Sequence, residues 1–141
     1  MRLVLVSWAS IILAAGATSE DRKNDKEELQ GTWQVVRHEF EGEQAPKEVS
    51  QGTKLTFKGD KYIGKSPERN YEGSFALNPA KTPKEIDLQP VEGDRQKLLG
   101  IYKLDGDNLT ICLGAARQSR PTQFVTSPDS GHTMYVMKRQ K

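Results

Sequence analysis

The chain has few of the residues from which disulfides and metal sites are built. Its 141 residues include one cysteine, Cys112, and two histidines, His38 and His132. A single cysteine cannot form an internal disulfide, so the hydrophobic core must hold the fold. No C-x-x-C or H-x-x-x-H spacing is present, so these three residues do not form a zinc-binding pattern. We therefore expect no metal and no cofactor, and we interpret Cys112 as a buried strand residue.

A large excess of charge of either sign is also missing. The sequence contains 21 Lys and Arg and 19 Asp and Glu, which gives a formal net charge of +2 at pH 7. Removing residues 1–17, which hold one Arg and no acid, lowers that charge by one, to +1. A nearly neutral chain has little electrostatic attraction to nucleic acid or to an anionic membrane. We expect no nucleic-acid partner.

One long apolar run is present, and it lies at the N-terminus. Met1-Arg2 is followed by an apolar stretch from Leu3 to Ala15 and by the small residues Ala15-Gly16-Ala17, after which the chain becomes strongly polar. This order is typical of a secretory signal peptide, here residues 1–17, cleaved after Ala17. The alternative is an uncleaved anchor, but a membrane-spanning helix needs about 20 apolar residues.

A signal peptide places the protein outside the cytoplasm, in the periplasm, the cell envelope or the extracellular space. No cysteine stands near the cleavage site to carry a lipid anchor. We therefore expect no stable membrane insertion after cleavage, and a monomer.

After the predicted cleavage site the chain consists of short β-type runs separated by turn residues. Residues 18–28 are charged and are expected to form a linker or a frayed helical segment, and residues 29–141 to form one domain. Alternating polar and apolar residues, as in Lys54–Lys58, are typical of half-buried strands. The expected β-type runs cover residues 33–40, 54–58, 61–64, 70–77, 86–88, 97–104, 109–113, 121–125 and 132–138.

The links between these runs determine the fold class. Gly59-Asp60 and the segment Asp105–Asn108 are tight-turn sequences. Parallel strands need crossovers of about a dozen residues, for which such turns leave no room. One short helix is expected over residues 46–51. The sequence predicts an all-β protein: an antiparallel up-and-down meander of about eight strands, closed into a barrel or curled into a half-barrel.

Gly31-Thr32-Trp33, at the start of the first strand, resembles the G-x-W signature of lipocalins. The resemblance implies that Trp33 packs across the closed end of a barrel, against a basic residue near the last strand. Arg139 or Lys138 would be that residue.

Longer blocks of the chain are similar to an uncharacterised lipocalin-like domain that is abundant in planctomycete bacteria. The blocks occur in the order and spacing of that family, and they cover residues 29–36, 55–62, 83–88, 99–107 and 120–124. The resemblance implies a lipocalin-like fold and a bacterial exported setting, and it brings no established activity.

Two polar clusters contain residue types that can carry out chemistry. A calcium loop that began with Asp105 and Asp107 would also need an acid or an amide two residues after Asp107. The chain has neither at that position, so we interpret Asp105 and Asp107 as turn residues. Asp129, Ser130 and His132 include the residue types of a hydrolase triad, but they are crowded into one loop without a G-x-S-x-G motif. We therefore expect no catalytic residues and no enzyme activity.

The remaining candidates are side chains expected to face the barrel interior. We predict that six of them line it: Phe57, Tyr62, Tyr71, Phe75, Ile101 and Ile111. Gly64, Gly73 and Gly100 would reduce the filling of the interior.

These side chains suggest a non-enzymatic binding module for a small apolar or amphipathic ligand, or for a protein partner. The alternative is a structural or protein-interaction module of the cell envelope with a filled barrel, and a hydrolase ranks third. An interior cavity above about 300 Å³ would favour the ligand-binding hypothesis.

Overall fold

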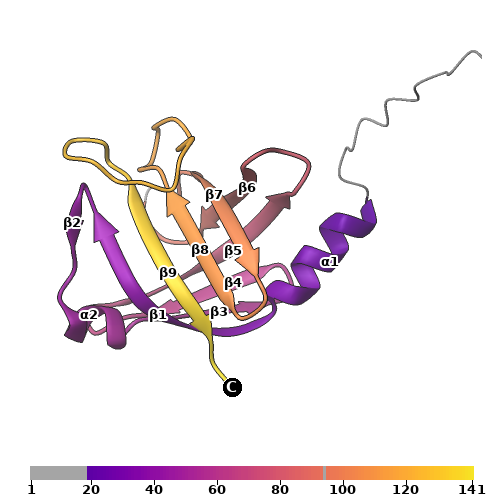
Figure 1. Ribbon diagram of the computed structural model, residues 1–141, viewed down its shortest axis with the longest axis horizontal. Coiled ribbons are helices and arrows are strands. Elements are labelled where there is room, and N and C mark those ends of the chain that lie inside the picture. The colour runs from indigo at the N-terminus through magenta and orange to yellow at the C-terminus, as the bar shows by residue number, and fades with distance from the viewer. Residues whose placement is uncertain (1–18, 94) are drawn as a thin grey trace, which may run out of the picture.

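A computed structural model of the chain describes residues 19–93 and 95–141, and the predicted signal peptide lies outside them (Figure 1). No helix in these ranges is long and apolar enough to cross a membrane. The elements in chain order are α1 (Ser19–Leu29), β1 (Gly31–Phe40), β2 (Glu43–Gln44), α2 (Lys47–Gln51), β3 (Lys54–Lys58), β4 (Lys61–Lys65), β5 (Asn70–Asn78), β6 (Lys84–Pro90), β7 (Leu98–Asp105), β8 (Asn108–Leu113) and β9 (Thr133–Arg139).

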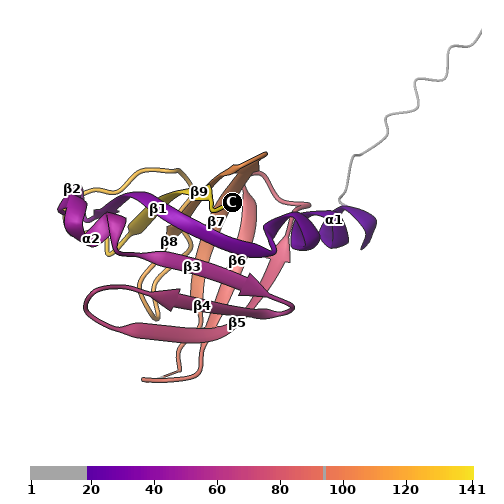
Figure 2. The ribbon, with the colours of Figure 1, turned by 90° about the horizontal axis from the view of Figure 1, so that it is seen from below.

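The strands form one antiparallel sheet in which each of β3 to β9 pairs with its neighbours along the chain. β1 pairs with β3 on one side and with β9 on the other, so β1 and β3 to β9 make a closed eight-stranded barrel (Figure 2). The predicted antiparallel meander is confirmed, and of the two predicted forms the closed barrel is the one observed. Closure pairs the two terminal strands and leaves no open edges there.

The alternation predicted for the first hairpin is present. In β3 and β4 the inward positions Leu55, Phe57, Tyr62 and Gly64 are buried, while the lysines at both strand ends are exposed. Two-residue turns close this hairpin at Gly59-Asp60 and the β7–β8 hairpin at Gly106-Asp107. Gly106 has a φ of 58°. The second central residue of this turn, Asp107, does not have a positive φ. The turn therefore matches type II′, in which only the first central residue has a positive φ, rather than the type I′ turn that Asp-Gly sequences favour.

Two features of the chain differ from the sequence-based expectation. Residues 121–125 are a loop rather than a strand, part of the long β8–β9 connection. That connection covers the outer face of the barrel, where Phe124 packs against a buried cluster of Ile101, Cys112 and Met134. β2 is the second difference: it is too short to give a β pattern, and it pairs with the end of β1.

Arg120 anchors the first part of this connection to the outer face. The Arg120 guanidinium donates to the Gly100 carbonyl oxygen at 2.8 Å and forms ion pairs with Asp87 at 2.8 Å and Glu85 at 3.4 Å. In the run predicted as a strand, Pro121 is buried and Phe124 is partly buried, whereas Val125 is exposed, and the backbone does not join the sheet.

The charged segment expected to be a linker or a frayed helix forms α1, which lies at the end of the barrel where β1 begins (Figure 1). The Asp25 carboxylate accepts a hydrogen bond from the Tyr102 hydroxyl at 2.6 Å and pairs with Lys84 at 2.9 Å. Lys26 pairs with Asp60 in the β3–β4 turn. Because Tyr102 is a core residue, these contacts fix the helix to this end of the barrel, the closed end.

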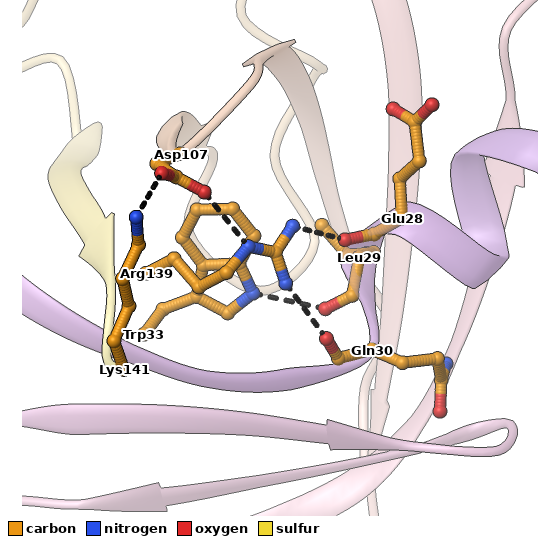
Figure 3. Close-up of polar contacts among 7 residues, drawn as sticks. All are labelled: Glu28, Leu29, Gln30, Trp33, Asp107, Arg139 and Lys141. Atoms are coloured by element: carbon orange, nitrogen blue, oxygen red, sulfur yellow. Dashed lines mark hydrogen bonds and ion pairs between the residues drawn. The ribbon is translucent and has the colours of Figure 1, made fainter.

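Trp33 and Arg139 form the centre of this closed end (Figure 3). Trp33 is fully buried, and its indole N–H donates to the Leu29 carbonyl oxygen at 2.9 Å. The Arg139 guanidinium lies 4.4 Å from the centre of the Trp33 ring. It also donates to the carbonyl oxygens of Gln30, at 3.0 Å, and Glu28, at 2.5 Å. Of the two basic residues that the resemblance suggested, Arg139 makes this contact.

Arg139→Gln should lower the free energy of unfolding by about 2 kcal/mol, because it removes two charged donors from backbone carbonyls and the cation from the Trp33 ring. Lys138→Gln removes the same charge from the neighbouring exposed position and should change stability by less than about 0.5 kcal/mol. Urea unfolding followed by tryptophan fluorescence measures both. Equal losses in the two variants would contradict the role of Arg139.

Candidate functional site

The barrel contains a cavity of about 390 Å³ at the end remote from α1. Its rim includes residues of the β4–β5 and β6–β7 connections, whereas α1 contacts the β3–β4 turn and the start of β6. Most of its wall is apolar. The apolar lining consists of Val35, Leu55, Leu88, Pro90, Leu98, Ile111, Leu113 and Met137.

Three tyrosines bring hydroxyl groups to the lining, which also contains the polar or charged side chains of Arg69, Asn70, Glu72 and Glu92. Tyr62 comes from β4, Tyr71 from β5 and Tyr135 from β9. Arg69 and Glu72 lie at the rim on the same side, and Glu92 lies on the β6–β7 connection. The cavity therefore combines a mostly aliphatic lining with hydroxyl groups contributed by β4, β5 and β9.

Three of the six predicted lining residues, Tyr62, Tyr71 and Ile111, do line this cavity. Phe57 and Phe75 are buried in the barrel core, where their rings meet edge to face at 5.0 Å, and they do not border the cavity.

The prediction for Ile101 is wrong. Gly100 and Tyr102 occupy the inward positions of β7, so Ile101 points outward under the β8–β9 connection. β7 is buried on both faces at this point, and an apolar side chain there does not reveal which face is the interior.

Two glycines explain how the tyrosine rings fit along the wall. In the β4–β5 ladder Gly64 lies opposite Tyr71, and Tyr62 lies opposite Gly73. A Cβ atom on Gly64 would lie 2.0 Å from Cε2 of Tyr71, and one on Gly73 would lie 2.2 Å from the Gln89 carbonyl oxygen and 2.8 Å from Cε1 of Tyr62. Each ring thus occupies the space that a side chain on the opposite strand would take. The rings lie against the wall, and the centre of the barrel stays open.

Burial controls the protonation of these hydroxyls. It raises the pKa of Tyr62 to about 12, with a smaller contribution from Tyr71, and it also raises the pKa of Tyr71 and Tyr135. A side-chain hydrogen bond between Tyr71 and Tyr135 opposes the rise in the pKa of Tyr71 and adds to the rise in the pKa of Tyr135. All three hydroxyls are protonated at neutral pH and can donate hydrogen bonds.

His38 packs against one of the lining tyrosines without itself bordering the cavity. Its ring stacks on Tyr135, its partner in the β1–β9 ladder, with a centroid distance of 4.4 Å and an interplanar angle of 11°. Burial lowers the pKa of His38, and the negative charge of Glu68 partly opposes this.

The two polar clusters that contain catalytic residue types make hydrogen bonds and ion pairs that stabilise the fold. The Ser130 hydroxyl donates to the Ser127 carbonyl oxygen at 2.7 Å and accepts from the His132 amide at 3.1 Å, so it stabilises a turn. Asp107 forms ion pairs with Arg139 at 3.2 Å and with Lys141 at 3.1 Å. These two cations, Lys141 more than Arg139, hold the pKa of Asp107 below its ordinary value. Among the described residues, no group of three His, Cys, Asp or Glu could hold a metal ion.

The sequence analysis missed Tyr135, Met137, Val35 and Arg69 as cavity residues. Tyr135 and Met137 alternate within a strand that was predicted, so period-two counting along β9 identifies them. Arg69 lies in a connection, and no sequence pattern indicates that this connection borders the cavity.

Comparisons with known proteins identify no family. No family model and no curated protein matches the chain. Among solved structures, it is similar to a DUF4847 family protein from Bacteroides vulgatus, with a TM-score of 0.49 and 12% identity over 84% of this chain and 99% of that chain. The planctomycete resemblance stays a prediction.

Gly64→Ala should reduce the free energy of unfolding by about 1–3 kcal/mol, because the new methyl group overlaps the Tyr71 ring. Tyr71→Leu removes that ring, so the double variant should lose less than the sum of the two single variants. A double-mutant cycle in urea measures the coupling. Additive losses would show that the contact between Gly64 and Tyr71 does not determine the packing here.

Stability should depend on pH through His38. Its pKa is lowered in the folded state, so protonation favours unfolding, and the free energy of unfolding should fall as the pH drops below the ordinary value of 6.5. His38→Phe keeps an aromatic ring on Tyr135 and should flatten this part of the pH profile. Parallel profiles for the two proteins in chemical denaturation would contradict the assignment to His38.

Proposed function

We propose that the protein is an exported, non-enzymatic binding module that takes a small apolar or amphipathic ligand inside its barrel. The observation that supports this most directly is the cavity of about 390 Å³. Ligand pockets usually measure about 300–1,000 Å³ and combine an apolar lining with a few polar groups. The volume lies near the lower limit, which favours a small molecule over a long lipid.

The way the wall is built also supports a ligand over a filled barrel. Gly64 and Gly73 hold two large rings against the strands, where larger residues would push them inward. Empty apolar space in a core lowers stability because its lining loses packing contacts. A purely structural barrel would gain stability from filling this space, whereas a binding module needs it open.

The proposal includes no catalytic step. Ser130 lies two residues before His132 in the sequence, and its hydroxyl stabilises a turn of the β8–β9 connection. Among the described residues, the cavity lining contains tyrosines, Arg69 and the carboxylates of Glu72 and Glu92, but no histidine, cysteine or serine. A cavity with hydrogen-bond donors and no nucleophile–base pair suits binding better than group transfer.

The full-length chain expressed in a bacterium should be recovered outside the cytoplasm with Thr18 as its first residue. Ala15→Arg places a large charged side chain at the cleavage site and should leave the leader attached. Cell fractionation and N-terminal sequencing measure both. Cytoplasmic recovery of the intact chain would contradict the export half of the proposal.

Native mass spectrometry of the recovered protein should show a bound small molecule. Leu98→Trp fills the rim of the cavity and should abolish that adduct. Ile63→Trp is the matched control, since Ile63 lies on β4 between two inward residues and faces outward. If no adduct forms and a set of apolar fluorescent probes fails to bind, the structural-module alternative is the better one.

A further inference from the structure

We propose that the outer face of the β3–β4 hairpin is a docking surface for a membrane that carries anionic phospholipids. Four lysines form this surface, here called the lysine face: Lys54, Lys58, Lys61 and Lys65. Their side chains occupy the outward positions of the two strands, so this inference is independent of the cavity and of any ligand inside the barrel.

The register of the hairpin brings the four lysines together in two pairs. Lys54 lies directly opposite Lys65, and Lys58 lies directly opposite Lys61. All four are exposed. Their Cα atoms are about 5 Å apart across each pair, and the two pairs are about 13 Å apart along the strands. The hairpin thus places four positive charges on a small area, although like charges directly opposite each other destabilise a sheet.

The fold itself does not account for these like-charged pairs. Lysines on the edge strand of a sheet prevent aggregation, but β3 and β4 are both paired on both sides in the closed barrel and have no edge to protect. Within the described residues none of the four lysines forms an ion pair. A partner that supplies negative charge would remove the repulsion within each pair.

The neighbouring strands neutralise little of this charge. β1 and β5 lie on either side of the hairpin (Figure 2). β1 places the uncharged Thr32 and Gln34 opposite the outward residues of β3, and the charged outward residue of β5 is Glu72, opposite Ile63. Asp60 in the turn already pairs with Lys26.

The barrel therefore separates charges that nearly cancel over the whole chain. Four lysines and Glu72 leave a local charge of 4 − 1 = +3 on this face, in a chain with a formal net charge of +2. The net charge of the chain argues against attraction to an anionic surface, but a local concentration of one sign produces such attraction within a Debye length.

The shape and the composition of the lysine face favour a flat partner over a linear polyanion. Single-stranded nucleic acids are bound in positively charged grooves with aromatic side chains on which bases stack. This surface is the outside of a barrel wall, and the outward residues between the lysines are Thr56 and Ile63, neither of which is aromatic. Lysine carries a compact charge on a long apolar stem, which suits contact with the headgroup layer of a bilayer.

Sedimentation with lipid vesicles tests this inference. The recovered protein, without its leader, should sediment with vesicles made of equal parts phosphatidylglycerol and phosphatidylcholine, and should stay in solution with vesicles of phosphatidylcholine alone. Raising the NaCl concentration from about 0.05 M to about 0.5 M should release it, because salt screens the attraction between exposed charges and the surface.

A double variant assigns the binding to the lysine face. Lys58→Gln combined with Lys61→Gln should weaken binding to the anionic vesicles by about 30-fold, since each lysine near such a surface contributes about fivefold. Its midpoint of urea unfolding should stay the same or rise, because a like-charged pair is removed. The matched control combines Lys81→Gln with Lys103→Gln, which removes the same charge from exposed positions in the β5–β6 connection and on β7. It should weaken binding less than about threefold.

Four outcomes would overturn the inference. Equal sedimentation with both kinds of vesicle would show that anionic lipid is not recognised, and equal losses in the two double variants would show that the position of the lysines does not matter. A lower urea midpoint for the variant at Lys58 and Lys61 would assign these lysines to the stability of the hairpin. Binding to soluble polyphosphate without binding to the anionic vesicles would replace the membrane by a linear polyanion.

Discussion

Pairing of the first strand with the last is the constraint on which the rest of this structure depends. β1 and β9 pair from Trp33 opposite Arg139 to Phe40 opposite Thr133, with one irregularity between Val35 and Arg37. This ladder closes the sheet, and closure creates an interior that a flat meander would lack. The same ladder brings Arg139 to Trp33 at the closed end and His38 to Tyr135 near the rim. One set of backbone hydrogen bonds therefore positions both ends of the barrel.

The two ends of the barrel are finished in different ways. At the closed end, α1 and the Trp33–Arg139 contact satisfy backbone carbonyls and cover the core. At the open end, glycines on β4 and β5 hold tyrosine rings along the wall and leave space between them. A small barrel is normally filled by its own side chains, so packing density must be reduced locally for a cavity to remain. The cross-strand Gly–Tyr pairs accomplish this here.

The long β8–β9 connection gives the barrel a second, outer core. Phe124 covers Ile101, Cys112 and Met134, and Arg120 joins the connection to the backbone and to the acids of β6. Strands β7 and β8 are consequently apolar on both faces over part of their length. Cys112 is buried in this outer core, and burial raises the pKa of its thiol. The thiol form is therefore favoured over the reactive thiolate.

The sequence by itself determined the strands, their turns and their antiparallel order, because alternation and glycine-containing turns are local properties of the chain. It also indicated Trp33 and a basic residue near the C-terminus, through a resemblance rather than through physical derivation. Only the tertiary structure decided which apolar residues face the interior. Ile101 was assigned to the wrong face and residues 121–125 to a strand, because a strand covered on both faces loses its alternation and a packed loop acquires apolar residues. The open volume at Tyr62, Tyr71 and Arg69 was beyond sequence reasoning, since it depends on which residues lie opposite one another across the ladders of the closed barrel.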